Sequence, residues 1–178
     1  MQRRYRSGLY ESRVDKILSL MPHACIGVDV IVGFPGETDI DFKLTYDFLH
    51  RLEVAYYHVF TYSERSQTPA IHLPGAIPVA IRRERNEVLR LLSEKKKHFF
   101  YQNHLNTSRP VLVEQDGDAS HWCGFTDNYI KVNLDKTLSE PNRIAHVWLQ
   151  EIQSNGEVLG SGQPGSPKHL VPKKLQLT

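Results

Sequence analysis

The stretch Cys25-Ile-Gly-Val-Asp-Val-Ile-Val-Gly-Phe-Pro-Gly-Glu-Thr38 decides the fold of this 178-residue chain. A β-branched apolar run ends in a glycine-rich turn, and Thr38 stands where a helix would begin. Strand–turn–helix junctions of this kind form the carboxyl edge of α/β sheets, where such sheets bind their ligands. Asp29 interrupts the apolar run with an acid. The stretch therefore predicts a parallel sheet with a candidate binding site at its end.

The segments around this stretch alternate between helix and strand. Thr38 is a suitable N-cap, and Asp41 three residues later completes a capping box. The alternation, with short links, predicts parallel pairing, and the nearly continuous apolar run indicates a strand covered on both faces. The expected elements are a helix over 8–21, a strand over 25–32, a helix from 38 to about 52 and a strand over 54–62.

The longest predicted helix covers residues 79–104, after an irregular segment rich in proline, glycine and serine at 63–78. Apolar spacing assigns its buried face to Ile81, Val88, Leu92, Lys95 and Phe99. The polar face is basic and carries Arg82, Arg83, Arg85, Arg90, Lys95, Lys96 and Lys97. Such a face is either a solvated charged surface or one that follows a phosphate backbone.

The composition is that of an ordinary folded protein, with 40% hydrophobic residues, 24% charged residues and a formal net charge of +2. These values argue against disorder, and they do not by themselves indicate a nucleic-acid-binding protein. Cys25 and Cys123 form neither a disulfide framework nor a metal-ligand spacing, so we expect no metal site and a reducing, cytoplasmic location. No apolar run is long enough to cross a membrane, and we expect no membrane partner.

Helical patterns stop at about Asn106, and five short strands follow. Turn signals of the Asp-Gly and Asn-Gly kind separate them, and this pattern is typical of a small β-barrel. We therefore expect an α/β domain over 1–104 and a five-stranded antiparallel barrel over 105–178, the residues after Gly162 forming a loose tail. Two parallel strands alone are marginal, so the first domain either pairs with other strands or belongs to a longer protein. Exposed sheet edges also favour pairing between copies of the chain.

Two motifs of the first domain resemble the radical S-adenosylmethionine methylthiotransferases of the MiaB type. The first is Asp29-Val-Ile-Val-Gly-Phe-Pro-Gly-Glu-Thr38, followed by Asp41-Phe42. The second is His58-Val-Phe-Thr-Tyr-Ser63, continued by Arg65 and by Thr68-Pro-Ala70.

The second domain resembles, over 106–160, the TRAM domain, which is a five-stranded RNA-binding barrel. Within it, Gly124-Phe-Thr-Asp-Asn-Tyr-Ile130 is most similar to the branch that modifies threonylcarbamoyl-adenosine in tRNA. The branches acting on isopentenyl-adenosine or on a ribosomal protein are the alternatives. As a fold, the resemblance implies the C-terminal portion of a radical SAM partial (βα)6 barrel followed by TRAM.

The function implied by the resemblance is that of a parent enzyme which installs a methylthio group on a modified adenosine beside the anticodon. The family uses S-adenosylmethionine and two [4Fe–4S] clusters held by cysteines, including a Cys-x3-Cys-x2-Cys motif. Cys25 and Cys123 match neither cluster motif, so we expect this chain to be an inactive C-terminal piece without catalytic residues. Its implied partners are the missing N-terminal part and the tRNA anticodon stem-loop. A non-catalytic RNA-binding module is the alternative from a different class.

The resemblance places S-adenosylmethionine against the two strand ends, and the implied cofactor-binding residues are Asp29, Ile31, Gly33, Phe34, Tyr62, Ser63 and Arg65. From the residues alone, Gly33 either lets the backbone approach a ligand or simply makes a tight turn. Asp29, expected on a buried strand, either bonds a ligand or pairs with Arg65. His58 is more typical of a buried, satisfied histidine than of a general base.

Aromatic and basic side chains of the barrel are the candidate RNA contacts. They are Trp122, Phe125, Tyr129, Lys131 and Arg143. Aromatic rings of small barrels stack on unpaired bases, while at least two of these aromatic rings are needed to fill the interior of so small a domain.

Overall fold

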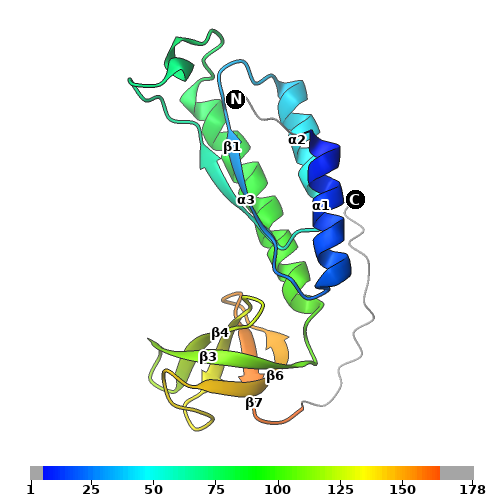
Figure 1. Cartoon of the computed structure of the whole chain (residues 1–178). Coiled ribbons are helices and arrows are strands. Elements are labelled where there is room, and N and C mark those ends of the chain that lie inside the picture. The colour runs from blue at the N-terminus through cyan, green and yellow to red at the C-terminus, as the bar shows by residue number, and fades with distance from the viewer. Residues whose placement is uncertain (1–5, 165–178) are drawn as a thin grey trace. The chain divides into compact units, whose positions relative to one another are not determined.

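The computed structural model describes residues 6–164 (Figure 1). The chain divides into two compact units, Met1–Lys96 and Lys97–Thr178. The first unit contains helices and a two-stranded sheet, and the second contains a closed barrel of five strands. No helix in the described part of the chain combines the length and the apolar character that a membrane span requires.

The first unit has every helix and strand that the sequence predicts, with ends shifted by one or two residues. Its elements are α1 (Ser7–Leu20), β1 (Gly27–Val32), α2 (Asp39–Arg51), β2 (Tyr56–Thr61) and the start of α3 (Val79–Gln102). A short 3-10 helix, η1 (Pro69–His72), lies inside the segment expected to be irregular. The predicted capping box is confirmed, since Thr38 Oγ1 accepts the N–H of Asp41 at 3.1 Å and Asp41 accepts the N–H of Thr38 at 2.9 Å.

The two strands pair in parallel, from Gly27 opposite Tyr56 to Val32 opposite Thr61. One face of this sheet packs on the three helices, and its core includes Val32, Leu49 and Leu89. The other face is open. It carries Asp29 and Ile31 on β1 and His58 and Phe60 on β2, all exposed.

The expectation of a sheet covered on both faces is thus wrong for the described chain, and so is the expectation of a buried Asp29 and a buried His58. A run of β-branched residues does not distinguish a strand with two covered faces from one with a single covered face.

Side chains of α3 close the outer edge of β2. Ser93 Oγ accepts the N–H of Tyr57 at 2.8 Å and donates to its carbonyl at 3.0 Å, and Asn86 Nδ2 donates to the carbonyl of Val59 at 3.1 Å. Between the strands, the N–H of Tyr62 donates to the carbonyl of Val32 at 2.8 Å. This register turns the backbone groups of even-numbered residues toward the partner strand and those of odd-numbered residues toward the edges.

The face of α3 that packs on the first unit differs from the predicted one. Ile81 and Lys95 are exposed, whereas the buried positions are Arg82, Arg85, Leu89, Leu92, Ser93 and Lys96. Lys96 Nζ donates to the carbonyl of Leu52 at the C-terminal end of α2, and burial lowers the pKa of Lys96 to about 8. The basic surface expected on this helix therefore loses three of its cations to the interior.

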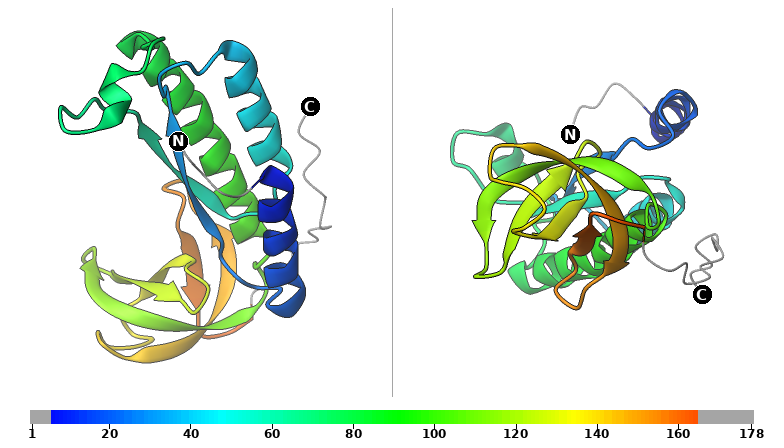
Figure 2. Two further views of the ribbon diagram at one scale, coloured as in Figure 1. Left: turned by 45° about the horizontal axis from the view of Figure 1, so that its top comes forward. Right: turned by 90° about the horizontal axis from the view of Figure 1, so that it is seen from below.

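The second unit is the predicted five-stranded barrel, closed in the order β3-β4-β5-β7-β6 (Figure 2). Its strands are β3 (Ser108–Gly117), β4 (His121–Thr126), β5 (Lys131–Asp135), β6 (Ile144–Ile152) and β7 (Val158–Ser161). All neighbours are antiparallel except β5 and β7, which are parallel. A closed ring with an odd number of strands cannot alternate direction throughout, so the all-antiparallel expectation could not hold.

The core of the barrel is aliphatic, with one tyrosine from the end of α3. Its buried members are Tyr101, Val111, Val113, Ile130, Val132, Leu134, Val147, Leu149 and Val158. The Tyr101 hydroxyl accepts the N–H of Lys131 at 3.1 Å, which satisfies this polar group inside an otherwise apolar core.

Candidate functional site

The turn after β1 is fixed by its own sequence. The N–H of Glu37 donates to the carbonyl of Phe34 at 3.0 Å, and Gly36 at the third position has a φ of 86°. A type II turn requires a positive φ at its third position and favours proline at its second, and Gly36 and Pro35 occupy these positions. The N–H of Gly36 also donates to the carbonyl of Gly75 at 2.8 Å, so the turn is tied to the segment before α3.

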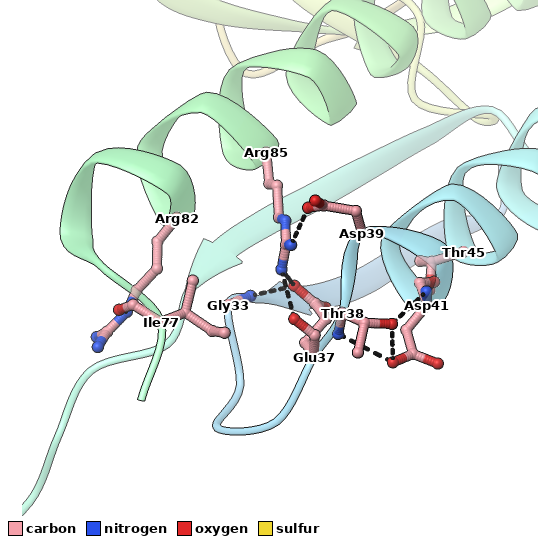
Figure 3. A network of polar contacts seen from close by, with 9 residues as sticks. All are labelled: Gly33, Glu37, Thr38, Asp39, Asp41, Thr45, Ile77, Arg82 and Arg85. Carbon is pink, nitrogen blue, oxygen red and sulfur yellow. Dashed lines mark hydrogen bonds and ion pairs between the residues drawn. The ribbon is translucent and has the colours of Figure 1, made fainter. Parts of the chain in front are cut away.

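Glu37 joins this turn to α3 (Figure 3). Its Oε2 accepts the N–H of Gly33 at 2.9 Å and lies 2.6 Å from Nη1 of Arg85. The same guanidinium donates to the Glu37 carbonyl at 3.0 Å and to Asp39 Oδ1 at 2.6 Å. Arg85 and Glu37 are both largely buried, whereas Asp39 is almost fully exposed. The buried pair therefore fixes the position of α3 against the end of β1.

Arg82 does the same for the end of β2. It donates to the carbonyls of Ile77 at 2.6 Å and Tyr62 at 3.1 Å and forms an ion pair with Glu64. The bond to Arg82 lowers the pKa of the Glu64 carboxyl. A Cβ built on Gly33 would lie 2.4 Å from Cγ of Arg82. Glycine is thus required at this position by the packing of Arg82, in addition to its φ of 76°.

The structure brings together some of the predicted cofactor-binding residues. Phe34 and Tyr62 meet edge to face with their ring centroids 5.4 Å apart, and the Arg82 guanidinium lies 5.5 Å from the Tyr62 ring centroid. The Tyr62 hydroxyl is buried and has no hydrogen-bond partner among residues 6–164. A buried hydroxyl without a partner carries a desolvation cost, which a bound polar group would offset.

The other predicted residues of this site are more open. Asp29 and Ile31 lie on the open face of the sheet, while Ser63 and Arg65 are exposed after β2. No contact joins the side chains of Asp29 and Arg65 within the described residues, so this alternative from the sequence is not observed. Gly33 is buried beneath the stem of Arg82.

Sequence reasoning missed the residues that organise the site, namely Arg82, Arg85 and Glu37. The sequence does contain a pattern that indicates their burial. Arg82 and Arg85 are spaced so that they lie on the same helix face as Leu89 and Leu92, which are buried. Counting arginine as a surface residue hid this face, although an arginine with paired nitrogens can be buried along its stem.

Two of the candidate RNA contacts are already engaged within the barrel. Lys136 Nζ lies 3.9 Å from the ring centroid of Trp122, which packs against the barrel core, and Lys131 Nζ lies 2.7 Å from Glu157 Oε1. Phe125 and Tyr129 lie together, with their ring centroids 6.2 Å apart. Tyr129 and Arg143 are exposed.

Neither cysteine has the surroundings of a reactive thiol or a metal ligand. Burial raises the pKa of Cys25 to about 11 and also raises the pKa of Cys123. Within residues 6–164, no group of three or more His, Cys, Asp and Glu residues could hold a metal ion. A shallow hollow of about 290 Å³ lies beside the outer edge of β2 and includes Arg90 and Glu94, but no residue of the turn after β1 lines it.

The fold and the site together define a class of protein. Its members have a mixed α/β unit with a strand–turn–helix site, followed by a small closed barrel. Comparison with curated proteins narrows this class. The chain is 38% identical over 135 residues to threonylcarbamoyladenosine tRNA methylthiotransferase MtaB of Aquifex aeolicus, covering 76% of this chain and 32% of that protein. It is 32% identical over 153 residues to MtaB of Bacillus subtilis, covering 84% and 34%.

A second group of relatives carries a different name. The chain is 47% identical over 94 residues to the tRNA-2-methylthio-N(6)-dimethylallyladenosine synthase of Mycobacterium avium, covering 53% of this chain and 13% of that protein. No family model matches the chain. Over most of its length the chain is similar to methylthiotransferases of the MtaB and MiaB types, and the similarity is that of a C-terminal MtaB-like fragment. It spans about a third of the length of the MtaB relatives.

Proposed function

We propose that this chain is part of an enzyme that transfers a methylthio group to a threonylcarbamoyl-adenosine in tRNA. The observation that supports this proposal is the 38% identity to an MtaB protein over 135 residues. The first unit has 96 residues, so a match of 135 residues includes parts of both units. The relative is therefore similar to parts of both units in the same order. Similarity to a single unit would not have supported a shared architecture.

The choice of the threonylcarbamoyl branch rests on the extent of the matches. Relatives named MtaB align over 131 to 153 residues, whereas those named dimethylallyladenosine synthases align over 94 to 117. The shorter matches reach up to 47% identity, but over 53% of the chain. We give weight to the longer matches because they cover 74–84% of this chain, against 53–66% for the shorter ones.

S-adenosylmethionine is the cofactor that we propose for the intact enzyme, where it would supply the radical. The residues at the strand ends fit such a molecule. Asp29 can accept hydrogen bonds from hydroxyl groups, Ile31 and Phe34 offer apolar contact, and the unpaired hydroxyl of Tyr62 needs a polar partner. In this proposal Gly33, with Arg82 behind it, holds the turn in place, and Ser63 and Arg65 contribute polar groups from the loop after β2.

The residues present do not fit an iron–sulfur cluster. The chain has two cysteines, which lie in different units, and burial disfavours the thiolate form of both. In the proposed enzyme, both [4Fe–4S] clusters are therefore held by residues outside this sequence. The contribution of this chain is to shape one wall of the cofactor site and to bind tRNA near the anticodon.

The proposal is tested by analysing tRNA nucleosides from cells in which the gene has been deleted. We expect the methylthio group to disappear from threonylcarbamoyl-adenosine and to persist on other modified adenosines. Complementation with the gene carrying Tyr62→Phe is the variant for the cofactor site, and Tyr46→Phe on α2 is its matched control. Loss of the methylthio group from a dimethylallyl-adenosine instead would assign the chain to the other branch, and an unchanged nucleoside profile would refute the function.

A further inference from the structure

We propose that Tyr129 is held on a strained backbone in order to present its ring to an unpaired RNA base, in a contact that owes little to charge. This inference deepens the proposed function, on which it rests, by naming the part of the RNA that the barrel recognises.

The backbone of Tyr129 is the first observation. Its φ is 62°, in the left-handed region, which costs an ordinary L-residue roughly 1–2 kcal/mol. Asn106 and Asn142 are the other non-glycine residues with positive φ in the described part of the chain, and asparagine tolerates this region. Tyrosine gains nothing there from its side chain. An outlier of this kind that the fold maintains suggests a function.

The turn around Tyr129 imposes this conformation. Thr126 Oγ1 accepts the N–H of Ile130 at 2.9 Å and donates to Asn128 Oδ1 at 2.7 Å. The N–H of Tyr129 donates to the carbonyl of Thr126 at 3.0 Å. In the same turn, Nη1 of Arg109 lies 3.2 Å from each carboxylate oxygen of Asp127. Thr126 and Asn128 are buried, whereas Tyr129 is 70% exposed. A rigid turn thus directs one aromatic ring into solvent.

The ring of Tyr129 adjoins an apolar row on the outside of the barrel. Phe125 lies 6.2 Å from it, centroid to centroid, and is paired across the strands with Leu112, which is paired in turn with Ile144. Leu112 is 52% exposed and Ile144 is 70% exposed. A planar ring beside an apolar strip suits the faces of unstacked bases, since every base offers a π-face.

The charges of the barrel argue against phosphate as the main contact. Residues 97–164 carry five Lys and Arg against eight Asp and Glu, a net charge of −3. Arg109 and Lys131 are paired with acids, and Lys136 lies over Trp122. Arg143, next to Ile144, is exposed and has no side-chain partner among the described residues. The described part of the barrel can neutralise few phosphates, so stacking should supply most of its affinity for RNA.

The test uses the full chain and fluorescence anisotropy with two labelled RNAs, a hairpin with an unpaired loop and a fully paired duplex of the same stem. We expect the chain to bind the hairpin at least about tenfold more tightly than the duplex, and Tyr129→Asn to reduce this preference without changing the slope of log K against log salt. Tyr129→Asn should weaken hairpin binding by about tenfold or more, whereas Tyr129→Phe, which keeps the ring, should bind like the wild type.

The stability of the same variant provides the second measurement. If the strain at Tyr129 serves RNA binding, Tyr129→Asn should lower the affinity for RNA and raise the stability of the barrel. Asparagine suits the left-handed backbone, so Tyr129→Asn should raise the urea midpoint of the barrel, followed by tryptophan fluorescence. A lowered midpoint would show that Tyr129 serves packing and would overturn the inference.

Two further results would also overturn the inference. The first is hairpin binding that Tyr129→Asn leaves unchanged and that depends steeply on salt, which would indicate a phosphate-binding surface. The second is a change of oligomeric state in light scattering with RNA affinity unchanged, which would make this face a protein interface. All of these results leave the nucleoside analysis, and with it the proposed function, untouched.

Discussion

Nη1 of Arg85 lies 2.6 Å from Oε2 of Glu37, the same carboxylate oxygen that accepts the N–H of Gly33. One ion pair therefore connects α3, the type II turn and the end of β1. Because both side chains are largely buried, the pair is screened little by solvent. It holds the candidate cofactor site together without itself facing the open side of the sheet.

Arg85→Met should destabilise the first unit by about 3 kcal/mol, because Glu37 would remain buried without its cation. The matched control is Asp39→Asn, which removes the exposed partner of the same guanidinium and should cost less than about 1 kcal/mol. Both tryptophans, Trp122 and Trp148, lie in the barrel. Urea unfolding followed by circular dichroism at a helix band, with tryptophan fluorescence beside it, separates the two units. Equal costs for the two variants would contradict the assigned role of Glu37.

Gly33→Ala should cost about 3 kcal/mol, in part from the positive φ and in part from the approach of its Cβ to Arg82. Gly36→Ala is the matched control, since Gly36 also has a positive φ but has open space where its Cβ would be. It should cost about 1 kcal/mol. The difference between the two free energies of unfolding measures the contact with Arg82, and a difference near zero would refute it.

The pH dependence of stability should report on Lys96. Its pKa is about 8 in the folded chain against an ordinary lysine pKa of 10.5, so the unfolded chain binds more protons between these two pH values. Stability therefore rises as the pH increases above 8, by about 1 kcal/mol between pH 8 and 9. Cys25, whose folded pKa of about 11 lies above the ordinary thiol pKa of 9.0, contributes the opposite slope from pH 9 upward.

Comparison with Lys96→Met isolates the Lys96 contribution, since Cys25 is the same in both proteins. The wild type should show the rise between pH 8 and 9 in urea unfolding, and the variant should lack it. Parallel profiles for the two proteins would mean that Lys96 is not desolvated in the folded chain.

Removal of the helix cap by Thr38→Ala should cost about 1 kcal/mol, because the N–H of Asp41 loses its acceptor at the start of α2. Thr45→Ala in the same helix is the control. Thr45 Oγ1 donates to the carbonyl of Asp41, which is an acceptor within the same helix, and alanine has the higher helix propensity, so this variant should be neutral or slightly stabilising. Thermal unfolding followed at a helix band measures both variants, and a loss shared equally by them would argue against the capping box.

Features set by neighbours in the sequence could be predicted from it. The capping box of Thr38 and Asp41, the turn at Gly36 and the order of elements depend on a few consecutive residues, and the structure has all three. The alternation of short strands after Asn106 likewise indicated a closed barrel. The parallel pairing of β5 with β7 follows from ring closure alone, once five strands are assumed.

Features set by distant residues were beyond the sequence. Nothing in the run around Asp29 tells which face the helices cover, since valine and isoleucine suit both arrangements. The burial of Arg82 depends on carbonyls that arrive from Tyr62 and Ile77. Trp122 and Tyr129 looked equivalent as aromatic residues, and only the structure shows that Trp122 packs against the barrel core while Tyr129 is exposed in a turn with a positive φ.

Because side chains close the outer edge of β2, only one edge of the small sheet can pair with a further strand. Ser93 and Asn86 occupy that edge, whereas the backbone groups of Gly27, Asp29 and Ile31 point toward the opposite edge, beside β1. Any additional strand, from a longer protein or from another copy, can extend the sheet only beside β1. An antiparallel copy centred on Asp29 would bring two carboxylates together, so the charge of Asp29 selects a strand of different sequence over an identical one.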